Sequence, residues 1–302
     1  AYSTLISLGY FDYLIEKAKG STPRKDIIWI LGSIQTISYS PYFDQNYHDI
    51  VQISIKYFKI SNKEVDLVLI TFAYMLLSFC LASFSQLTEK ELKDITDDEI
   101  IQRAFFIVEN KVVSDIGPIF HYINNFIYND ENTMKFISMG FVQLFYHIFT
   151  MCNNDYQIQI LGILNNAAIE PIDSTFEILK SRIVVDYLPG ILETGKLSLK
   201  KAAINLVLTL VVKIRLSLPK YVDPGINSQE NIDPGEILFY LIQKVFLIIP
   251  DFLSSDDKEM IRFSLQVMHC IAVELKTLDQ NDADGILQLF SYEIKEVLFD
   301  TI

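Results

Sequence analysis

The chain has 302 residues, of which 50% are apolar and 21% are charged, so it can bury a large continuous core. With 25 Lys and Arg against 38 Asp and Glu, its net charge is −13, which argues against wide contacts with nucleic-acid phosphates and favours basic partners. Three cysteines, Cys80, Cys152 and Cys270, stand apart within apolar runs. That pattern argues against a disulfide or zinc framework and favours reduced core thiols in a cytoplasmic or nuclear protein.

The chain starts at Ala1 without a methionine, so we expect a fragment that lacks its original targeting signals. Helices are the expected elements throughout. Residues 3–9 are typical of a helix end, and two helices are expected between Pro41 and about Ile60. The other expected helices span residues 10–20, 25–34, 64–84, 98–109, 119–128, 131–138, 141–149, 158–168, 199–214, 236–249, 256–274 and 282–302. No alternating strand pattern occurs, so the sequence predicts an all-α fold.

Two segments are expected to be loops. Residues 85–99 are acidic and predict a solvent-facing loop. Residues 218–235 are rich in proline, glycine, asparagine and aspartate, which predicts a loop insertion.

The segment Leu67–Phe84 has 18 residues without a charge, which is long enough in principle to span a membrane. Polar residues such as Thr71 and Ser78 interrupt it, and both flanks are acidic where a basic bias would set topology. It also falls in phase with the repeat described next. We therefore expect a buried helix and no membrane partner.

A repeating unit is clearest in Met139–Pro189, which reads as a helix, a polar break at 153–155, a second helix, a proline-containing elbow and two more helical segments. No segment of this size can bury its apolar face alone, so copies of it must stack on one another.

Three local motifs recur along the chain. One motif is Gly9-Tyr-Phe-Asp-Tyr-Leu14 followed by Trp29-Ile-Leu-Gly-Ser-Ile34, and a second is Gly140-Phe-Val-Gln-Leu-Phe145 followed by Ile163-Leu-Asn-Asn-Ala-Ala168. A third is Leu199-Lys-Lys-Ala-Ala-Ile204. These motifs resemble those of the armadillo-repeat family, and the best match is to importin-α. The resemblance implies an armadillo-type α-solenoid, a right-handed superhelix of about six three-helix repeats that occupies residues 1–302 as one domain.

The positions that correspond to the family's groove tryptophan are Trp29, Tyr74, His121, Gly162 and Ile204, at intervals of 45, 47, 41 and 42 residues. In importin-α, these tryptophans stack on lysine stems of an extended peptide, and asparagines four residues later hydrogen-bond its backbone. An aromatic face attracts cations, and a side-chain amide both donates and accepts.

No complete Trp/Asn pair occurs here. Ser33 stands at the position where the asparagine partner of Trp29 is expected. Ile204 and Leu208 keep neither the aromatic ring nor the amide of such a pair. Asp26, one turn before Trp29, would add a carboxylate. The resemblance thus implies these peptide-binding residues: Trp29, Ser33, Tyr74, Ser78, His121, Asn125, Asn166 and Asp26.

Each of these residues also has a purely structural interpretation. Trp29 and Tyr74 lie on apolar helices and would serve as core residues there. Asn125 and Asn166 would need hydrogen-bond partners wherever they are buried, and His121 would be structural.

Catalytic motifs are missing from the sequence: it holds no phosphate-binding glycine loop, HExxH, GxSxG or CxxC pair. The four histidines fall in different repeats without a second metal ligand three or four residues later. We therefore expect no enzyme activity, no metal and no cofactor.

Two functions remain open. The first is an adaptor that binds an extended, basic peptide such as a nuclear localisation signal for nuclear import, in the cytoplasm, the nucleus or both. A nuclear transport receptor would then bind a missing N-terminal segment. The alternative is a structural armadillo scaffold that binds a folded partner or a helix and has no role in transport.

Overall fold

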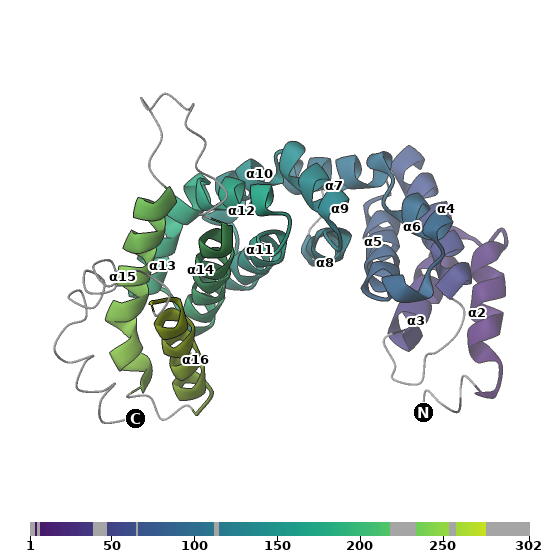
Figure 1. Ribbon diagram of the computed structural model, residues 1–302. Helices are drawn as coiled ribbons and strands as arrows, with labels where there is room; N and C mark the ends of the chain where they lie inside the picture. Colours follow the sequence, from purple (N-terminus) through teal and green to yellow (C-terminus); the bar gives the residue numbers. More distant parts are fainter. Residues whose placement is uncertain are drawn as a thin grey trace. The chain divides into compact units, whose positions relative to one another are not determined.

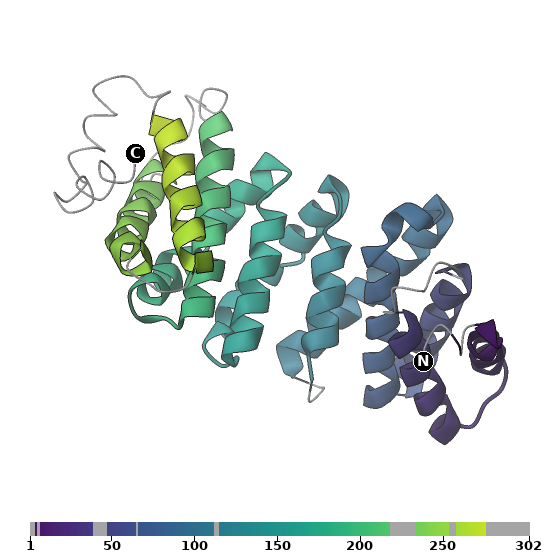
Figure 2. The same cartoon turned by 90° about the horizontal axis from the view of Figure 1, so that it is seen from below.

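The computed structural model describes residues 4, 7–38, 47–64, 66–111, 115–217, 234–253 and 258–275, and the regular structure in these residues is helical. The predicted all-α fold is confirmed. The helices fall into two compact units, residues 1–141 and 142–302. Figures 1 and 2 show the helices lying side by side within each unit. That residues 1–302 act as one uninterrupted solenoid stays a prediction.

The first unit contains eight α-helices of the described chain and one short 3-10 helix at Phe84–Gln86. The α-helices are α2 (Tyr10–Lys19), α3 (Arg24–Ser38), α4 (Tyr47–Glu64), α5 (Leu67–Ala82), α6 (Glu89–Ile95), α7 (Asp98–Asn110), α8 (Gly117–Phe126) and α9 (Asp130–Ser138).

The second unit begins at Val142, the second residue of α10, and Phe141 still belongs to the first unit. A π-helical turn, Ile183–Tyr187, precedes α13. The α-helices are α10 (Phe141–Phe149), α11 (Asn154–Ala167), α12 (Ile172–Leu179), α13 (Leu188–Thr194), α14 (Leu197–Ser217), α15 (Pro234–Leu253) and α16 (Lys258–Leu275).

Short polar residues and glycines set several helix ends. Asn153 caps α11 by accepting a hydrogen bond of 2.9 Å from the Tyr156 N–H. Gly9 before α2 and Gly140 before α10 have φ angles of 73° and 84°, a region that glycine enters without steric cost. The same three residues stand at breaks between the helices that the sequence predicts.

The expected helix over residues 64–84 is wrong at its start. Helix α4 runs through Glu64, and α5 begins at Leu67 because Asp66 caps it. The Asp66 carboxylate accepts hydrogen bonds of 3.1 Å from the N–H groups of Val68 and Leu69. Of the two helices expected between residues 41 and 60, the described part is the single helix α4, and residues 39–46 lie outside the described chain.

The expected acidic loop over residues 85–99 is also wrong, because α6 forms within it. Thr88 and Glu91 make a capping box, in which the Thr88 Oγ1 accepts from the Glu91 N–H and the Glu91 carboxylate accepts from the Thr88 N–H at 2.8 Å. Ile95, at the end of this helix, is fully buried. Of the expected loop at 218–235, residues 218–233 lie outside the described chain and α15 begins at Pro234; the expected helix at 282–302 lies outside it as well.

Helix α5 is the centre of the first unit. It is buried on nearly every side and packs against α3, α4 and α8. The Tyr74 ring meets the edges of Phe58 and Tyr122 at centroid distances of 6.0 and 5.2 Å, and its hydroxyl donates to the Ile100 carbonyl at 2.7 Å. Burial raises the pKa of Tyr74 well above its ordinary value. Among the described helices, none is both long enough and apolar enough to cross a membrane.

In the second unit, α14 takes the corresponding central place. It packs against α11, α12, α13, α15 and α16. Two side-chain hydrogen bonds tie α14 to α11: Thr209 donates to the Asn165 amide oxygen at 2.7 Å, and Asn154 donates to the Ser198 hydroxyl at 3.3 Å.

A lysine of α4 caps the end of α2. The Lys56 ammonium donates to the carbonyls of Ala18, Lys19 and Gly20 at 2.9, 2.8 and 2.8 Å. A cation at a helix C-terminus also complements the negative end of the helix dipole. Partial burial lowers the pKa of this lysine.

We expect Lys56→Met to lower the free energy of unfolding by about 1–3 kcal/mol, because three carbonyls lose a charged donor. Urea denaturation measures this change. Lys59→Met is the matched control, since Lys59 is exposed on the same helix. Equal effects of the two substitutions would contradict the capping role.

A pH effect follows from the pairing of Asp66 with Arg24. The Arg24 guanidinium donates to the Asp66 carboxylate, with one of its contacts at 2.8 Å, and this bond together with the backbone N–H groups of Leu69 and Val68 holds the pKa of Asp66 below its ordinary value. The unfolded chain therefore binds more protons than the folded chain as the pH falls through the usual Asp range.

We expect Asp66→Asn to cost about 1 kcal/mol of unfolding free energy at pH 7, because the ion pair with Arg24 is lost. The difference between the two chains should narrow as the pH falls from about 5 to about 2, where the unmodified chain also loses the charge. Urea denaturation of both chains across this pH range provides the measurement. A difference that is constant with pH would refute the electrostatic origin.

Candidate functional site

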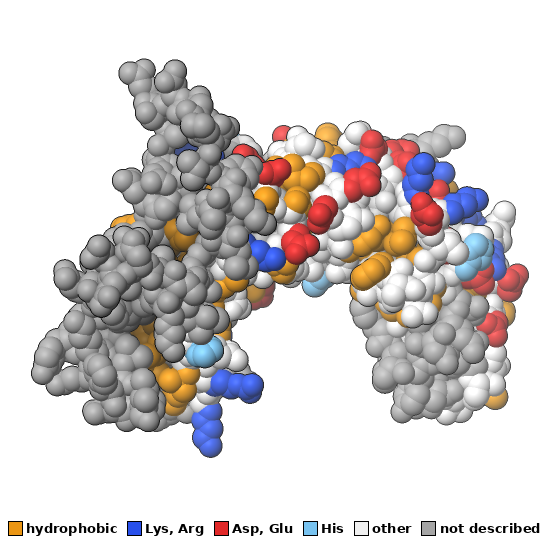
Figure 3. Space-filling view, viewed as in Figure 1, with side chains coloured by type: hydrophobic (Ala, Val, Ile, Leu, Met, Phe, Trp, Pro, Cys, Tyr) orange, Lys and Arg blue, Asp and Glu red, His pale blue; other side chains and the backbone are white. Residues whose placement is uncertain are grey.

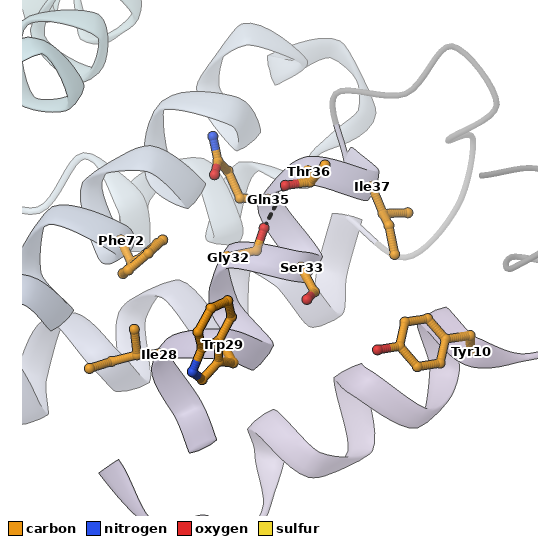
Figure 4. Close-up of a pocket in the computed structure, with 9 residues that line it drawn as sticks. All are labelled: Tyr10, Ile28, Trp29, Gly32, Ser33, Gln35, Thr36, Ile37 and Phe72. Carbon is orange, nitrogen blue, oxygen red and sulfur yellow. Dashed lines mark hydrogen bonds between the residues drawn. The ribbon is translucent and has the colours of Figure 1, made fainter. Parts of the chain in front are cut away.

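A groove of about 610 Å³ crosses the surface of α3 in the first unit (Figure 4). Its most prominent side chain is Trp29, whose surface is 75% exposed. Tyr10 of α2 lies at one end and Phe72 of α5 at the other. The lining residues are Tyr10, Ile28, Trp29, Gly32, Ser33, Gln35, Thr36, Ile37 and Phe72.

The burial pattern of α3 turns Trp29 outward. Ile27, Leu31 and Ile34 are buried, and their spacing of four and three residues forms one apolar stripe that faces the core. Trp29 follows Ile27 by two residues, or about 200° around the helix, and so lies on the opposite side. The sole tryptophan is therefore at the surface of α3 and not in its core.

Gly32 keeps the middle of the groove open. A Cβ atom built at this position meets the Phe72 ring at 3.5 Å, which is ordinary contact, so a small side chain would fit and a larger one would fill the groove. The Thr36 hydroxyl donates to the Gly32 carbonyl at 2.8 Å. The floor of the groove is thus helix backbone and short polar side chains.

Among the residues that the structure describes, those that line the groove carry no charge. Asp26 is exposed on α3, three residues before Trp29, and it does not belong to the lining. Within the described residues, no ion pair involves the Asp26 carboxylate. Any charge that Asp26 contributes acts from outside the groove.

Tyr74 and Ser78, the expected peptide-binding pair that follows Trp29 and Ser33 along the chain, are buried. They are 0% and 2% exposed, so neither contacts a peptide at the surface. The residue that α5 contributes to the groove is Phe72, which the sequence reasoning missed. Thr71, the polar residue directly before it, is a signal that marks this side of α5 as the outward one, although Ser78, another polar residue of the helix, is buried.

The side chain of Asn125 in α8 forms hydrogen bonds to a neighbouring helix. Its amide nitrogen donates to the Ser78 carbonyl at 3.0 Å and to the Ser78 hydroxyl at 3.1 Å. Two of the expected peptide-binding residues therefore bond to each other and join α8 to α5. His121 is exposed one turn earlier on α8, and neither His121 nor Asn125 lines the Trp29 groove.

The remaining expected positions lie in the second unit. Gly162 of α11 is half-buried, and a Cβ atom there would meet nothing within 4 Å, so space is open where the family places an aromatic ring. Asn166, one turn later, is exposed. Ile204 of α14 is buried, as its apolar side chain requires.

The described part of the chain shows no grouping of metal ligands and no reactive buried thiol. No set of three or more His, Cys, Asp or Glu residues is placed there to hold a metal ion. Burial raises the pKa of the Cys80 thiol, which keeps it protonated and unreactive. The side chain of Cys270 lies outside the described residues.

We expect Asn125→Ala to lower the free energy of unfolding by about 1–2 kcal/mol, because two hydrogen bonds between α8 and α5 are lost. His121→Ala on the same helix is the control and should change stability by less than about 0.5 kcal/mol. Thermal unfolding, followed by circular dichroism, measures both. An unchanged stability of the Asn125 variant would argue against its structural role.

No protein-family model matches the chain, and no curated protein matches it. The chain is similar to solved structures. One is an engineered protein from the Northeast Structural Genomics Consortium, with a TM-score of 0.62 at 12% identity over 87% of this chain and 98% of that one.

Two others are designed armadillo repeat proteins. One was solved in complex with the peptide (KR)4, with a TM-score of 0.58 at 10% identity over 85% of this chain and 98% of that one. The other was computationally designed for modular peptide recognition and has the same TM-score, identity and coverage. At such identities the likeness shows the fold alone. The chain therefore has an all-α, armadillo-type solenoid fold, as its sequence predicts.

Proposed function

We propose that this chain is a non-catalytic adaptor that binds an extended, basic peptide, and that the groove across α3 is part of the binding surface. The observation that carries the proposal is the exposed Trp29 indole, which stands in an open groove with Tyr10 and Phe72 at its ends. Aromatic faces attract cations, so this lining suits the side chain of a lysine or arginine.

The polar residues of the groove suit an extended peptide backbone. Ser33, Gln35 and Thr36 all line the groove and supply donors and acceptors. An extended chain has no internal hydrogen bonds and needs such partners. Of the expected site residues, Trp29 and Ser33 are the two that share this groove, and Asp26 lies near it on the same helix.

Charge favours a basic ligand. The net charge of −13 attracts cations over a distance, and acidic side chains gather around α6 and α7 on the face in Figure 3. Some of these are already bonded: Asp98 pairs with Lys135, and Glu99 accepts from Asn62 at 2.8 Å. Their role for a ligand is a general potential, while Asp26 is the acidic residue of α3 itself, three residues before Trp29.

Two similar structures support the same ligand class. One designed armadillo repeat protein is in complex with (KR)4, and another was designed for modular peptide recognition. A nuclear localisation signal is a basic peptide, and the importin-α resemblance of the sequence supports it as the natural ligand. The adaptor would then serve nuclear import and occur in the cytoplasm and the nucleus.

A specific observation favours the alternative of a scaffold for a folded partner or a helix. Tyr74 and Ser78 are buried and Asn125 is bonded to Ser78, so the series of peptide contacts that importin-α uses does not continue onto α5. A partner that inserts one side chain beside Trp29 needs no such series. This alternative has no transport role.

Fluorescence polarisation with a labelled, lysine-rich bipartite peptide tests the proposal. We expect binding that weakens with salt, and we expect Trp29→Ala to weaken it about tenfold, because the cation loses its aromatic partner. Gly32→Leu should weaken it similarly by filling the groove, while leucine's higher helix propensity protects stability.

Phe106→Ala is the matched control, since Phe106 is an aromatic residue that is 44% exposed on α7 and does not line the groove. Absence of binding at tens of micromolar, or equal binding by the Trp29 and Phe106 variants, would reject the basic-peptide proposal and leave the folded-partner scaffold.

A further inference from the structure

The described lining of the groove offers aromatic walls and neutral acceptors to a cation, and none of these residues is a carboxylate. Trp29, Tyr10 and Phe72 supply the aromatic rings, and Ser33, Gln35 and Thr36 supply polar groups. The nearest acidic residue on α3, Asp26, is outside the lining. A cation that enters the groove thus exchanges water for ring faces and hydroxyl oxygens without gaining a direct counter-charge.

Lysine and arginine respond differently to such surroundings. The lysine ammonium is compact and strongly hydrated, so it loses more when water is removed and no carboxylate replaces it. The arginine guanidinium is planar and weakly hydrated, and it stacks on aromatic faces. It also carries five N–H donors in a fixed plane, which neutral oxygens at its edge can accept.

The side chains are arranged to meet both the face and the edge of a guanidinium. Figure 4 shows the Trp29 indole and the Ser33 hydroxyl around the same open space, with the Tyr10 hydroxyl directed toward it from α2. The Thr36 hydroxyl gives its proton to the Gly32 carbonyl, so its oxygen is left as an acceptor. One ring face and several acceptors therefore border a single cavity.

We infer that the Trp29 groove is an arginine-selective subsite. This inference rests on the proposed function and names the side chain that the groove takes from a basic peptide. In a peptide that contains both cations, the arginine occupies the groove and the lysines remain at its rim, where Asp26 is exposed to solvent.

Labelled octa-arginine and octa-lysine, which have equal length and charge, test the selectivity by fluorescence polarisation on the full chain. We expect octa-arginine to bind about threefold to tenfold more tightly, which is the scale of a partly desolvated cation–π contact. In Trp29→Ala the two peptides should bind with nearly equal affinity. In Phe106→Ala the preference for octa-arginine should persist. Circular dichroism confirms that each variant is folded.

The outcomes separate the two levels of the proposal. Equal affinities for both peptides, tighter binding of octa-lysine, or an arginine preference that survives Trp29→Ala would each overturn the arginine-selective subsite and leave basic-peptide binding intact. No binding of either peptide would overturn both. An octamer of citrulline, which has the shape of arginine without its charge, should not bind, and its binding at similar affinity would reject the cationic mechanism.

Discussion

The first unit depends on the enclosure of α5. A helix that is apolar on nearly every side is stable in water only when neighbours cover it, and α3, α4 and α8 do so. Tyr74 shows how complete the enclosure is, because its ring lies between Phe58 and Tyr122 and its hydroxyl bonds to a carbonyl of α7. A buried hydroxyl must find such a partner.

The same enclosure shapes the surface of the unit. Because Tyr74 and Ser78 face inward, α5 presents Phe72 to the groove, and the buried stripe of α3 leaves Trp29 outward. The groove is therefore a by-product of how two neighbouring helices are rotated when they pack. Its chemistry follows from which residues that rotation leaves at the surface, namely aromatic rings and neutral polar groups.

The all-α repeat fold was predictable because helical periodicity and unit spacing recur along the chain. The rotation of α5 was not, since an apolar helix carries no amphipathic signal and a spacing of 45 residues from Trp29 selected the wrong face at Tyr74. The acidic composition of residues 85–99 indicated a loop in place of helix α6. The spacing of Thr88 and Glu91, which is that of a capping box, is a sequence signal for the start of this helix. Sequence also left open whether Asn125 meets a ligand or a neighbouring helix, which depends on tertiary contacts.

Hydrogen bonds and ion pairs between successive helix layers join residues at similar distances along the chain. Arg24 to Asp66, Ser78 to Asn125 and Asn165 to Thr209 span 42, 47 and 44 residues. Links of this range close only moderate loops, so each layer can assemble on its predecessor without waiting for the far end of the chain. Folding can then spread from a local nucleus inside either unit, and during synthesis the layers near the N-terminus can form while later ones are still being made.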